Sequence, residues 1–355
     1  MKIAIDATNL KAGGGLSHLK QISKEIFDKE DFEVHLVLLA KSNDFYKVNA
    51  NVKIHRLGFE NKGKLNKVFS ELKTFISLRN LLKTHKPDAV LSFMEKYNSF
   101  TILASAFLGL RIFVSDRSNP LKKIPKSTEF LRKLTYKYAT GIIAQTQFAK
   151  NVLSAKTKNK NIRVIPNPVK EIQNYPDIAK ENIILNVGRL VPEKGQKYLI
   201  EAFLKINEKA DWRVVILGDG PLRNQLEEQV KILGLDKQVQ FLGAVNNVDE
   251  WLAKASIFVF PSISEGFPNA LAEAMSAGLP CVSFDCNAGP RDLIENDVNG
   301  YLVEVGEVDE ITKSMKRLMD DEVRRDQVGL QASKISIRLD KIKICKDYLS
   351  FMNIN

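Results

Sequence analysis

The sequence predicts an α/β protein with two doubly wound domains that face each other across a cleft. Three observations favour this fold class: short apolar runs rich in β-branched residues, helical patterns between these runs, and a single pause in the pattern near the middle of the chain. Short apolar strands that alternate with helices are typical of parallel sheets covered on both faces. A chain of 355 residues with 44% apolar content is long enough for two such domains.

The expected strands and helices alternate along both halves. In the first half we expect strands at 2–7, 34–40, 52–57, 88–93, 111–116 and 141–146, and helices near 16–28, 65–85, 126–139 and 147–155. In the second half we expect strands at 183–189, 212–218, 239–243, 257–262 and 280–285, and helices near 197–209, 221–233 and 268–277. Three prolines and no regular period mark residues 164–182 as a linker, so the domains should span residues 1–170 and 181–340.

Composition excludes several classes of protein. The longest apolar run, Phe100 to Leu110, is cut by Arg111 and is too short to cross a bilayer. The N-terminal stretch "MKIAIDATNL" lacks the apolar core of a signal peptide, so we expect a cytosolic protein. The cysteines form no Cys-x-x-Cys pair, and we interpret all three as buried thiols of a reducing compartment: Cys281, Cys286 and Cys345.

Charge is distributed unevenly along the chain. Residues 1–170 carry 31 Lys+Arg against 13 Asp+Glu, or +18, whereas the remainder carries 22 against 29, or −7. This asymmetry indicates that the first half faces an anionic surface or ligand. The helix expected at 63–86 is basic and has an apolar stripe of Leu65, Val68, Phe69, Leu72, Ile76 and Leu82. Either the stripe faces the core, or the helix rests on anionic lipid.

The first strand runs into a glycine-rich turn. Gly13, Gly14 and Gly15 precede a helix, where glycines let a phosphate approach the backbone at the helix N-terminus. The turn is interpreted as a phosphate or donor contact, or as a plain turn. Its spacing differs from the G-x-G-x-x-G of a dinucleotide site. His18 lies just beyond, either on the helix surface or in a site.

Two cations follow the first strand of the second half. Arg189 follows a strand and a glycine, and Lys194 lies just ahead of the helix expected to start near Gly195. Together with a helix N-terminus they would make a receptor for a diphosphate, since arginine offers a planar fork and lysine a point charge. Taken alone, the segment could equally be a solvated turn.

The stretch "SISEGFPNALAEAMSAGLP" carries two carboxylates near the start of a helix. Pro268 suits the first helical position, so the helix should begin around 267–269 and leave free backbone N–H groups near Phe267, Asn269 and Ala270. Glu265 and Glu273 would accept hydrogen bonds from hydroxyl groups. Two carboxylates for hydroxyls and two cations for phosphates predict a pocket for a nucleotide sugar.

These segments resemble glycosyltransferase family 4, which has the GT-B fold of two Rossmann-like domains. The segments "GRLVPEKG", "LGDGPLRNQLE", "VQFLGAV" and "AGPRDLIENDVNGYLV" follow the order of that family, and Glu265 and Glu273 match its Glu-x7-Glu motif. The resemblance covers nearly the whole chain. It implies transfer with retention at the anomeric carbon, and a C-terminal helix near 341–355 that packs back on the first domain.

The resemblance also implies roles for individual residues. Arg189 and Lys194 would hold the diphosphate, Glu273 the ribose hydroxyls, and Glu265 with the amides after it the donor sugar. The predicted donor-binding set is Gly14, Gly15, Arg189, Lys194, Glu265, Phe267, Pro268, Asn269, Ala270, Leu271 and Glu273. The predicted catalytic residues within it are Glu265, Arg189 and Lys194.

No metal or other cofactor is expected for the transfer step. Cationic side chains and helix N-termini would stabilise the departing nucleoside diphosphate, and none of the twenty aspartates forms the Asp-x-Asp pattern of metal-dependent transferases. The chain departs from the family in the first domain, because no histidine follows the strands at 88–93 and 111–116. Glu95, Asp116 and Arg117 are the acceptor-side candidates there, and each could instead be a salt-bridged surface residue.

The resemblance favours a UDP-linked hexose or N-acetylhexosamine as donor, and a lipid-linked or polysaccharide glycan of the bacterial surface as acceptor. The basic first domain fits peripheral attachment to the inner face of the cell membrane, whose lipids are anionic. One alternative is a UDP-sugar epimerase of GT-B fold, although its catalytic set is not matched. A nucleic-acid binder is another, but no aromatic-interleaved basic motif or known module is present. An NAD-dependent dehydrogenase would need the glycine fingerprint.

Overall fold

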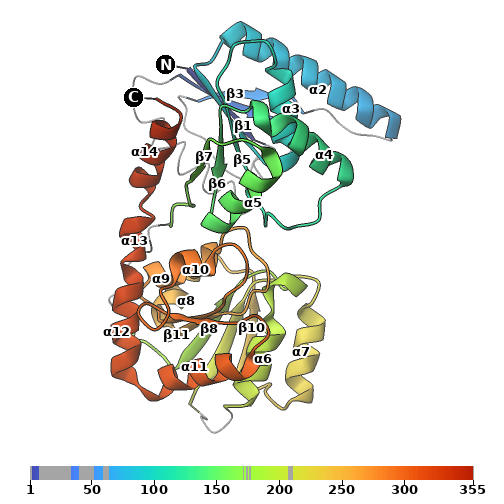
Figure 1. The fold of residues 1–355 in the computed structure, drawn as a ribbon. Coiled ribbons are helices and arrows are strands. Elements are labelled where there is room, and N and C mark those ends of the chain that lie inside the picture. The colour runs from blue at the N-terminus through green and yellow to red at the C-terminus, as the bar shows by residue number, and fades with distance from the viewer. Residues whose placement is uncertain are drawn as a thin grey trace. The chain divides into compact units, whose positions relative to one another are not determined.

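The computed structural model describes two compact units (Figure 1). Described are residues 2–7, 33–39, 52–58, 64–170, 172, 175, 177–206 and 211–354, with the backbone alone for 2–7 and 64–67. The first unit comprises Met1–Pro168 and Lys341–Asn355, and the second comprises Val169–Asp340. The chain therefore changes unit within the segment 164–182, and its C-terminal helix belongs to the first unit.

The first unit contains a parallel sheet of seven described strands in the order β3-β2-β1-β4-β5-β6-β7. The strands are β1 Lys2–Ala7, β2 Glu33–Leu38, β3 Lys53–Arg56, β4 Ala89–Phe93, β5 Ile112–Ser115, β6 Gly141–Ala144 and β7 Ile162–Val164. The helices are α2 Lys64–His85, α3 Glu95–Ala104, α4 Lys126–Thr135, the 3-10 turn η1 Tyr136–Tyr138, α5 Gln147–Thr157 and α14 Lys341–Phe351. The strand order reverses between β1 and β4.

The second unit repeats this plan with a parallel sheet of six strands in the order β10-β9-β8-β11-β12-β13. Its strands are β8 Ile183–Val187, β9 Arg213–Leu217, β10 Val239–Gly243, β11 Ile257–Phe260, β12 Cys281–Phe284 and β13 Tyr301–Val303. Its helices are η2 Pro192–Lys194, α6 Gln196–Leu204, α7 Arg223–Ile232, α8 Val248–Lys254, α9 Asn269–Ser276, α10 Pro290–Leu293, α11 Val308–Asp320, α12 Glu322–Ser333 and α13 Ile335–Arg338. Here the order reverses between β8 and β11.

Alternate residues of the inner strands β2 and β4 are buried on opposite faces of the sheet, as a doubly wound fold requires. In the first unit Leu36 and Leu91 pack with α14, whereas Val37 and Val90 pack with α2. The helix α14 inserts Phe351 against the strands, where a Cβ on Gly141 would lie 2.6 Å from the ring. This glycine lets the C-terminal helix approach the sheet closely, and the burial of each large apolar side chain of α14 contributes about 1.5–3 kcal/mol.

The helix α2 confirms the range of the expected basic helix, but its stripe is divided. Leu82 is fully buried, whereas Val68, Phe69, Leu72 and Ile76 are each at least half exposed. The core contact of α2 is made instead by a row that includes Leu78 and the small polar Ser70 and Thr74. An apolar face of α2 is therefore left at the surface.

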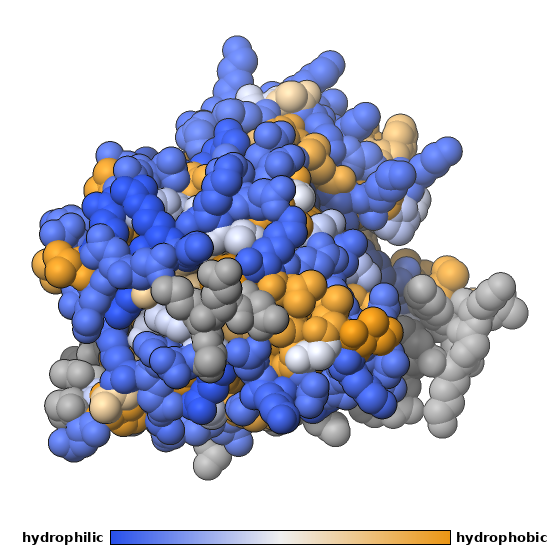
Figure 2. Space-filling model, turned by 90° about the horizontal axis from the view of Figure 1, so that it is seen from below, coloured by the Kyte–Doolittle hydropathy of each residue, from blue (hydrophilic) through white to orange (hydrophobic). Residues whose placement is uncertain are grey.

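Among the described helices, none is both long and apolar enough to cross a bilayer. The face shown in Figure 2 is mostly hydrophilic, and apolar side chains gather only in limited areas of it.

Candidate functional site

Two loops of the second unit flank the point where its strand order reverses. One loop joins β8 to η2 and α6, and the other joins β11 to α9. In doubly wound sheets the loops on the two sides of such a switch point diverge and leave a crevice where ligands bind. The loops are joined to each other, because the amide of Ile263 donates to the carbonyl of Glu193 at 2.9 Å.

Gly195 sets how closely these two loops approach. Its φ is +65°, and a Cβ at this position would lie 2.0 Å from the carbonyl oxygen of Pro261. Only glycine tolerates both the left-handed backbone and this contact. As a result, Lys194 on the first loop reaches the second loop.

Lys194 and Glu265 form an ion pair across the two loops. Lys194 Nζ lies 2.5 Å from Glu265 Oε1, and the side chains are 23% and 9% exposed. The ammonium also lies 5.5 Å from the centre of the Phe260 ring. Arg189, five residues earlier, is exposed, and its carbonyl accepts a hydrogen bond from Gln196 Nε2 at 3.1 Å. The structure thus brings together Lys194 and Glu265, both predicted site residues, and places Arg189 on the same loop as Lys194.

The helix α9 begins at Asn269, within the predicted range, but Pro268 precedes the helix instead of occupying its first position. Another expectation was wrong: the amide of Asn269 is not free, since it donates to the carbonyl of Phe267 at 3.0 Å. Pro268, with φ −85° and ψ 73°, is the middle residue of this tight turn into the helix. The amides of Ala270 and Leu271 lie in the first helical turn, where a helix offers no carbonyl to receive them.

The side chains that follow Glu265 differ in their access to a ligand. Phe267 and Leu271 are buried in the core of the second unit, and Pro268 is buried as well. Leu271 can therefore offer a ligand its backbone only. Asn269 and Ala270 are half-buried.

Glu273 is half-buried one turn into α9, and its pKa is raised to about 7. Burial is the main cause; Asp249 raises this pKa further, and Lys170 lowers it. Lys170 and Asp249 are themselves paired at 2.7 Å. Sequence reasoning missed this ion pair, because its partners are 79 residues apart and neither belongs to a motif.

A third loop, between β12 and α10, supports the start of α9. Gly289 has φ +133°, and a Cβ there would lie 2.2 Å from Pro268 Cδ. In the same loop Cys286 is 1% exposed, and burial, with a further contribution from Glu265, raises the pKa of its thiol to about 12. The thiol is therefore protonated at pH 7 and is no nucleophile. The sequence signal for this supporting loop was Gly289 directly before Pro290 at the start of α10.

The acceptor-side candidates lie at the ends of β4 and β5 in the first unit. Asp116 is buried, and its Oδ1 accepts hydrogen bonds from Asn98 at 2.9 Å and from the hydroxyl of Tyr136 at 2.5 Å. Its Oδ2 lies 3.3 Å from Arg132. Burial, then the charge of Glu95, raises the pKa of Asp116 to about 6. These contacts make Asp116 a supporting residue of the fold.

Glu95 and Arg117 are more accessible than Asp116. Glu95 accepts a hydrogen bond from Ser118, and the residue before it, Met94, has φ +77°, an uncommon backbone conformation that often marks functional sites. Arg117 donates to the hydroxyl of Tyr348 at 3.2 Å. Its Nε and Nη2 are buried without a hydrogen-bond partner in the part of the chain that the structure describes. Gly14, Gly15 and His18 lie outside the described residues.

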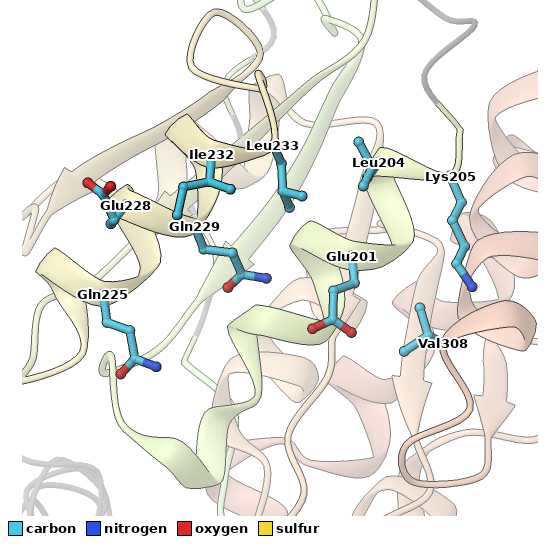
Figure 3. A pocket seen from close by; sticks show the side chains of 9 residues that line it. All are labelled: Glu201, Leu204, Lys205, Gln225, Glu228, Gln229, Ile232, Leu233 and Val308. Carbon is cyan, nitrogen blue, oxygen red and sulfur yellow. The ribbon is translucent and has the colours of Figure 1, made fainter.

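A separate pocket of about 640 Å³ lies between α6 and α7 (Figure 3). It is lined by Glu201, Leu204, Lys205, Gln225, Glu228, Gln229, Ile232, Leu233 and Val308. None of these residues belongs to the predicted donor set. On α6 the lining residues are in the C-terminal part of the helix, whereas Lys194 and Gly195 precede its N-terminus. We therefore do not place the donor in this pocket.

Comparison with known proteins identifies the family. Residues 12–171 match the model of Glycosyltransferase Family 4, and residues 169–335 match that of Glycosyl transferases group 1. The chain belongs to glycosyltransferase family 4. An alpha-1,4-N-acetyl-D-galactosaminyltransferase of Campylobacter jejuni, named for a PP-undecaprenol-linked glycan, is 29% identical over 92% of this chain and 91% of its own length.

Further relatives agree with this assignment. This glycosyltransferase is 29% identical to an Escherichia coli UDP-Gal:alpha-D-GlcNAc-diphosphoundecaprenol alpha-1,3-galactosyltransferase, over 78% of the chain and 79% of the relative. The fold matches the crystal structure of Anabaena HepE in complex with UDP, with a TM-score of 0.82 at 20% identity over 99% of this chain and 100% of that one. The GT-B architecture predicted from the sequence is confirmed, and the relatives act on lipid-linked and lipopolysaccharide glycans.

Proposed function

We propose that this glycosyltransferase transfers a hexose or N-acetylhexosamine from a UDP-sugar to a lipid-linked glycan acceptor, with retention and without a metal ion. The observation that carries the proposal is the ion pair between Lys194 and Glu265 at the switch point of the second unit. Glu273 lies nearby in the sequence, one turn inside α9. Cations and carboxylates on adjoining loops suit a ligand that has both phosphates and hydroxyl groups.

Each of these side chains has a distinct part in donor binding. Glu273 accepts hydrogen bonds from the ribose hydroxyls, and Lys194 with Arg189 binds the diphosphate. When Lys194 binds the phosphates, its ion pair with Glu265 breaks, and Glu265 can accept hydrogen bonds from the donor sugar. The first-turn amides of α9 add donors at the positive end of a helix.

Transfer breaks the bond between the anomeric carbon and the β-phosphate oxygen, and the electron pair leaves with UDP. The acceptor hydroxyl oxygen forms the new bond on the same face, and its proton passes to the β-phosphate oxygen of the departing UDP. Negative charge grows on the leaving group, and the two cations stabilise it, an effect of several kcal/mol in preorganised sites. This role of Lys194 and Arg189 takes the place of a metal ion.

The first unit suits an acceptor that is anchored in a membrane. The relatives in Campylobacter jejuni and Escherichia coli are named for undecaprenol-linked diphosphate acceptors. Arg117 has two buried nitrogens that no described residue binds, which is suited to an anionic group of the acceptor. The exposed apolar residues of α2 lie among basic ones, in a half of the chain with a charge of +18, 31 Lys+Arg against 13 Asp+Glu. Such a surface binds anionic lipid.

A donor panel tests this function. The purified protein is titrated by calorimetry with UDP- and GDP-linked hexoses and N-acetylhexosamines, and turnover is measured with an undecaprenyl-diphosphate-linked sugar. We expect UDP-sugars to bind at least tenfold tighter than their GDP counterparts, and transfer to give an α-linked product from an α-linked donor. Equal affinity for GDP-sugars or an inverted product would contradict the proposal. Release of an epimerised sugar from the donor alone would instead favour an epimerase.

A further inference from the structure

Three of the four histidines of the chain, which are far apart in sequence, meet in the first unit. They are His35 on β2, His55 on β3 and His85, the last residue of α2, and one ligand atom of each lies within 4.8 Å of those of the others. The ring centres are 5.1 Å apart for His35 and His55, and 4.4 Å apart for His35 and His85. We propose that His35, His55 and His85 form a binding site for a divalent first-row transition metal ion, of which Zn²⁺ is the best fit.

The register of the sheet explains why these side chains share a face. His35 is paired with Lys53, so His55, two residues further along β3, points to the same side as His35. Val37 of β2 and Leu39, which directly follows β2, pack in the same cluster as Leu78 and Leu82 of α2, so this is the side that α2 covers. His85, at the C-terminal end of α2, completes the set on that side. The negative end of a helix favours a cation there.

A carboxylate orients His35 as metal ligands are usually oriented. His35 Nε2 lies 3.2 Å from Glu33 Oε1, and His35 Nδ1 lies 2.9 Å from His55 Nε2. With Nε2 donating to the carboxylate, Nδ1 presents its lone pair toward the other histidines. Metal-bound histidines typically donate their second N–H to a carboxylate in this way. Lys53 also pairs with Glu33 at 2.5 Å and competes for its charge.

The geometry requires only a small adjustment. Zinc–nitrogen bonds of about 2.0–2.1 Å put tetrahedral ligand atoms about 3.3 Å apart. The pair of His35 Nδ1 and His55 Nε2 at 2.9 Å therefore opens by about 0.4 Å, and wider pairs, all within 4.8 Å, close by about 1.5 Å at most. His35 is 1% exposed and anchored, whereas His55 and His85 are half-buried and leave room for the ion.

The position of the site indicates its role. His35 is the third of six residues in β2, His55 is the third of four in β3, and His85 ends α2 shortly before β4 begins. His35 and His85 therefore lie toward the amino ends of β2 and β4, whereas substrates of such sheets bind beyond the carboxyl ends. A metal ion here would tie β2, β3 and α2 together, so its effect is on the stability of the first unit.

The test uses the full-length protein without a histidine tag, treated with EDTA and dialysed. Zn²⁺ is titrated by calorimetry, Co²⁺ by the visible absorption of its nitrogen-ligated form, and thermal unfolding is measured with and without Zn²⁺. We expect one ion per chain, a higher Tm with Zn²⁺, and affinity more than 100-fold lower in H55Q and in H85Q. E33Q should bind about 10–100-fold more weakly, as loss of an orienting carboxylate does.

T84Q is the matched control, because it places the same amide side chain on an exposed position next to His85. Its affinity should stay within twofold of that of the unmodified protein. If H55Q cannot be folded, H85Q at the helix end and the Co²⁺ spectrum of the unmodified protein decide the question. Equal binding by H85Q and T84Q, or no Co²⁺ absorption at millimolar Co²⁺, would overturn the site. Donor binding and turnover are measured separately, so failure of this site leaves the proposed function untouched.

Discussion

At the scale of single residues, Lys194 has two competing partners. Its ammonium is paired with Glu265 at 2.5 Å, and a donor diphosphate would draw it away. We expect K194A to lower kcat by about 10²–10³-fold, as loss of one group that stabilises transition-state charge does. K197A is the control, since Lys197 is an exposed lysine on α6 that lies over the Tyr198 ring. Initial rates with a saturating UDP-sugar measure the effect, and similar losses in both variants would contradict the role of Lys194.

Glu273 gives a prediction on donor affinity and pH. Its pKa of about 7 means that the carboxylate is half protonated at neutral pH. Because the ionised form accepts hydroxyl hydrogen bonds, UDP affinity of the unmodified protein should rise from pH 6 to pH 8. E273Q should bind UDP more weakly at pH 8 and show little of this rise. Calorimetric titrations at several pH values check it, and an unchanged slope in E273Q would rule out Glu273 as its source.

Glu273 also has a predictable effect on stability, with the opposite sign. Between the ordinary pKa of 4.5 and the folded value of about 7, the folded protein binds more protons than the unfolded chain. The free energy of unfolding therefore falls as pH rises through that window. At pH 8, E273Q should be more stable than the unmodified protein by about 1–3 kcal/mol, and the two should converge below the ordinary pKa of 4.5, near pH 4. Urea unfolding at both pH values measures the difference.

At the scale of elements, the exposed apolar face of α2 predicts lipid binding. L72E/I76E replaces two residues that are 53% and 50% exposed, so the fold should tolerate it. Lost apolar contact and added negative charge should weaken flotation with anionic liposomes more than tenfold. I232E/L330E makes the same change at exposed positions of the second unit, 74% and 67% exposed, and should bind as the unmodified protein does. If L72E/I76E and I232E/L330E floated with the liposomes to the same extent, α2 would not be a lipid-binding surface.

Elements differ in how well local sequence predicts them. The long buried strands were predicted correctly, because continuous runs of apolar β-branched residues are typical of such strands. The strands Ile162–Val164 and Tyr301–Val303 were missed, since three residues carry no measurable period. The helix α3 was missed because "EKYNSFTILA" mixes aromatic and β-branched residues, and tertiary contacts with α4 and the sheet select its conformation.

Site residues likewise differ in whether local sequence alone predicts them. Glu265 and Glu273 belong to one short motif, so the sequence predicted them, and Lys194 follows a strand in a recognisable segment. The contact of Gly195 with Pro261 and the histidine cluster depend on chain segments that only the folded sheet brings together. In α2 the apolar residues were visible in the sequence, but which of them face solvent depended on the packing of Leu78 and Leu82.

At the scale of the whole molecule, a metal ion could act at the three-histidine site or at the donor site. Removing metal ions with EDTA distinguishes the two. Lys194 and Arg189 are proposed to stabilise the departing UDP, so the initial rate at 25 °C should change less than twofold in EDTA and gain nothing from Mg²⁺ or Mn²⁺. The R189A/K194A variant should be nearly inactive under all these conditions. Chelation should nevertheless lower Tm through the three-histidine site. If EDTA abolished turnover equally in the unmodified protein and in H85Q, and Mn²⁺ restored both, the metal would act at the donor site and the cationic mechanism would be wrong.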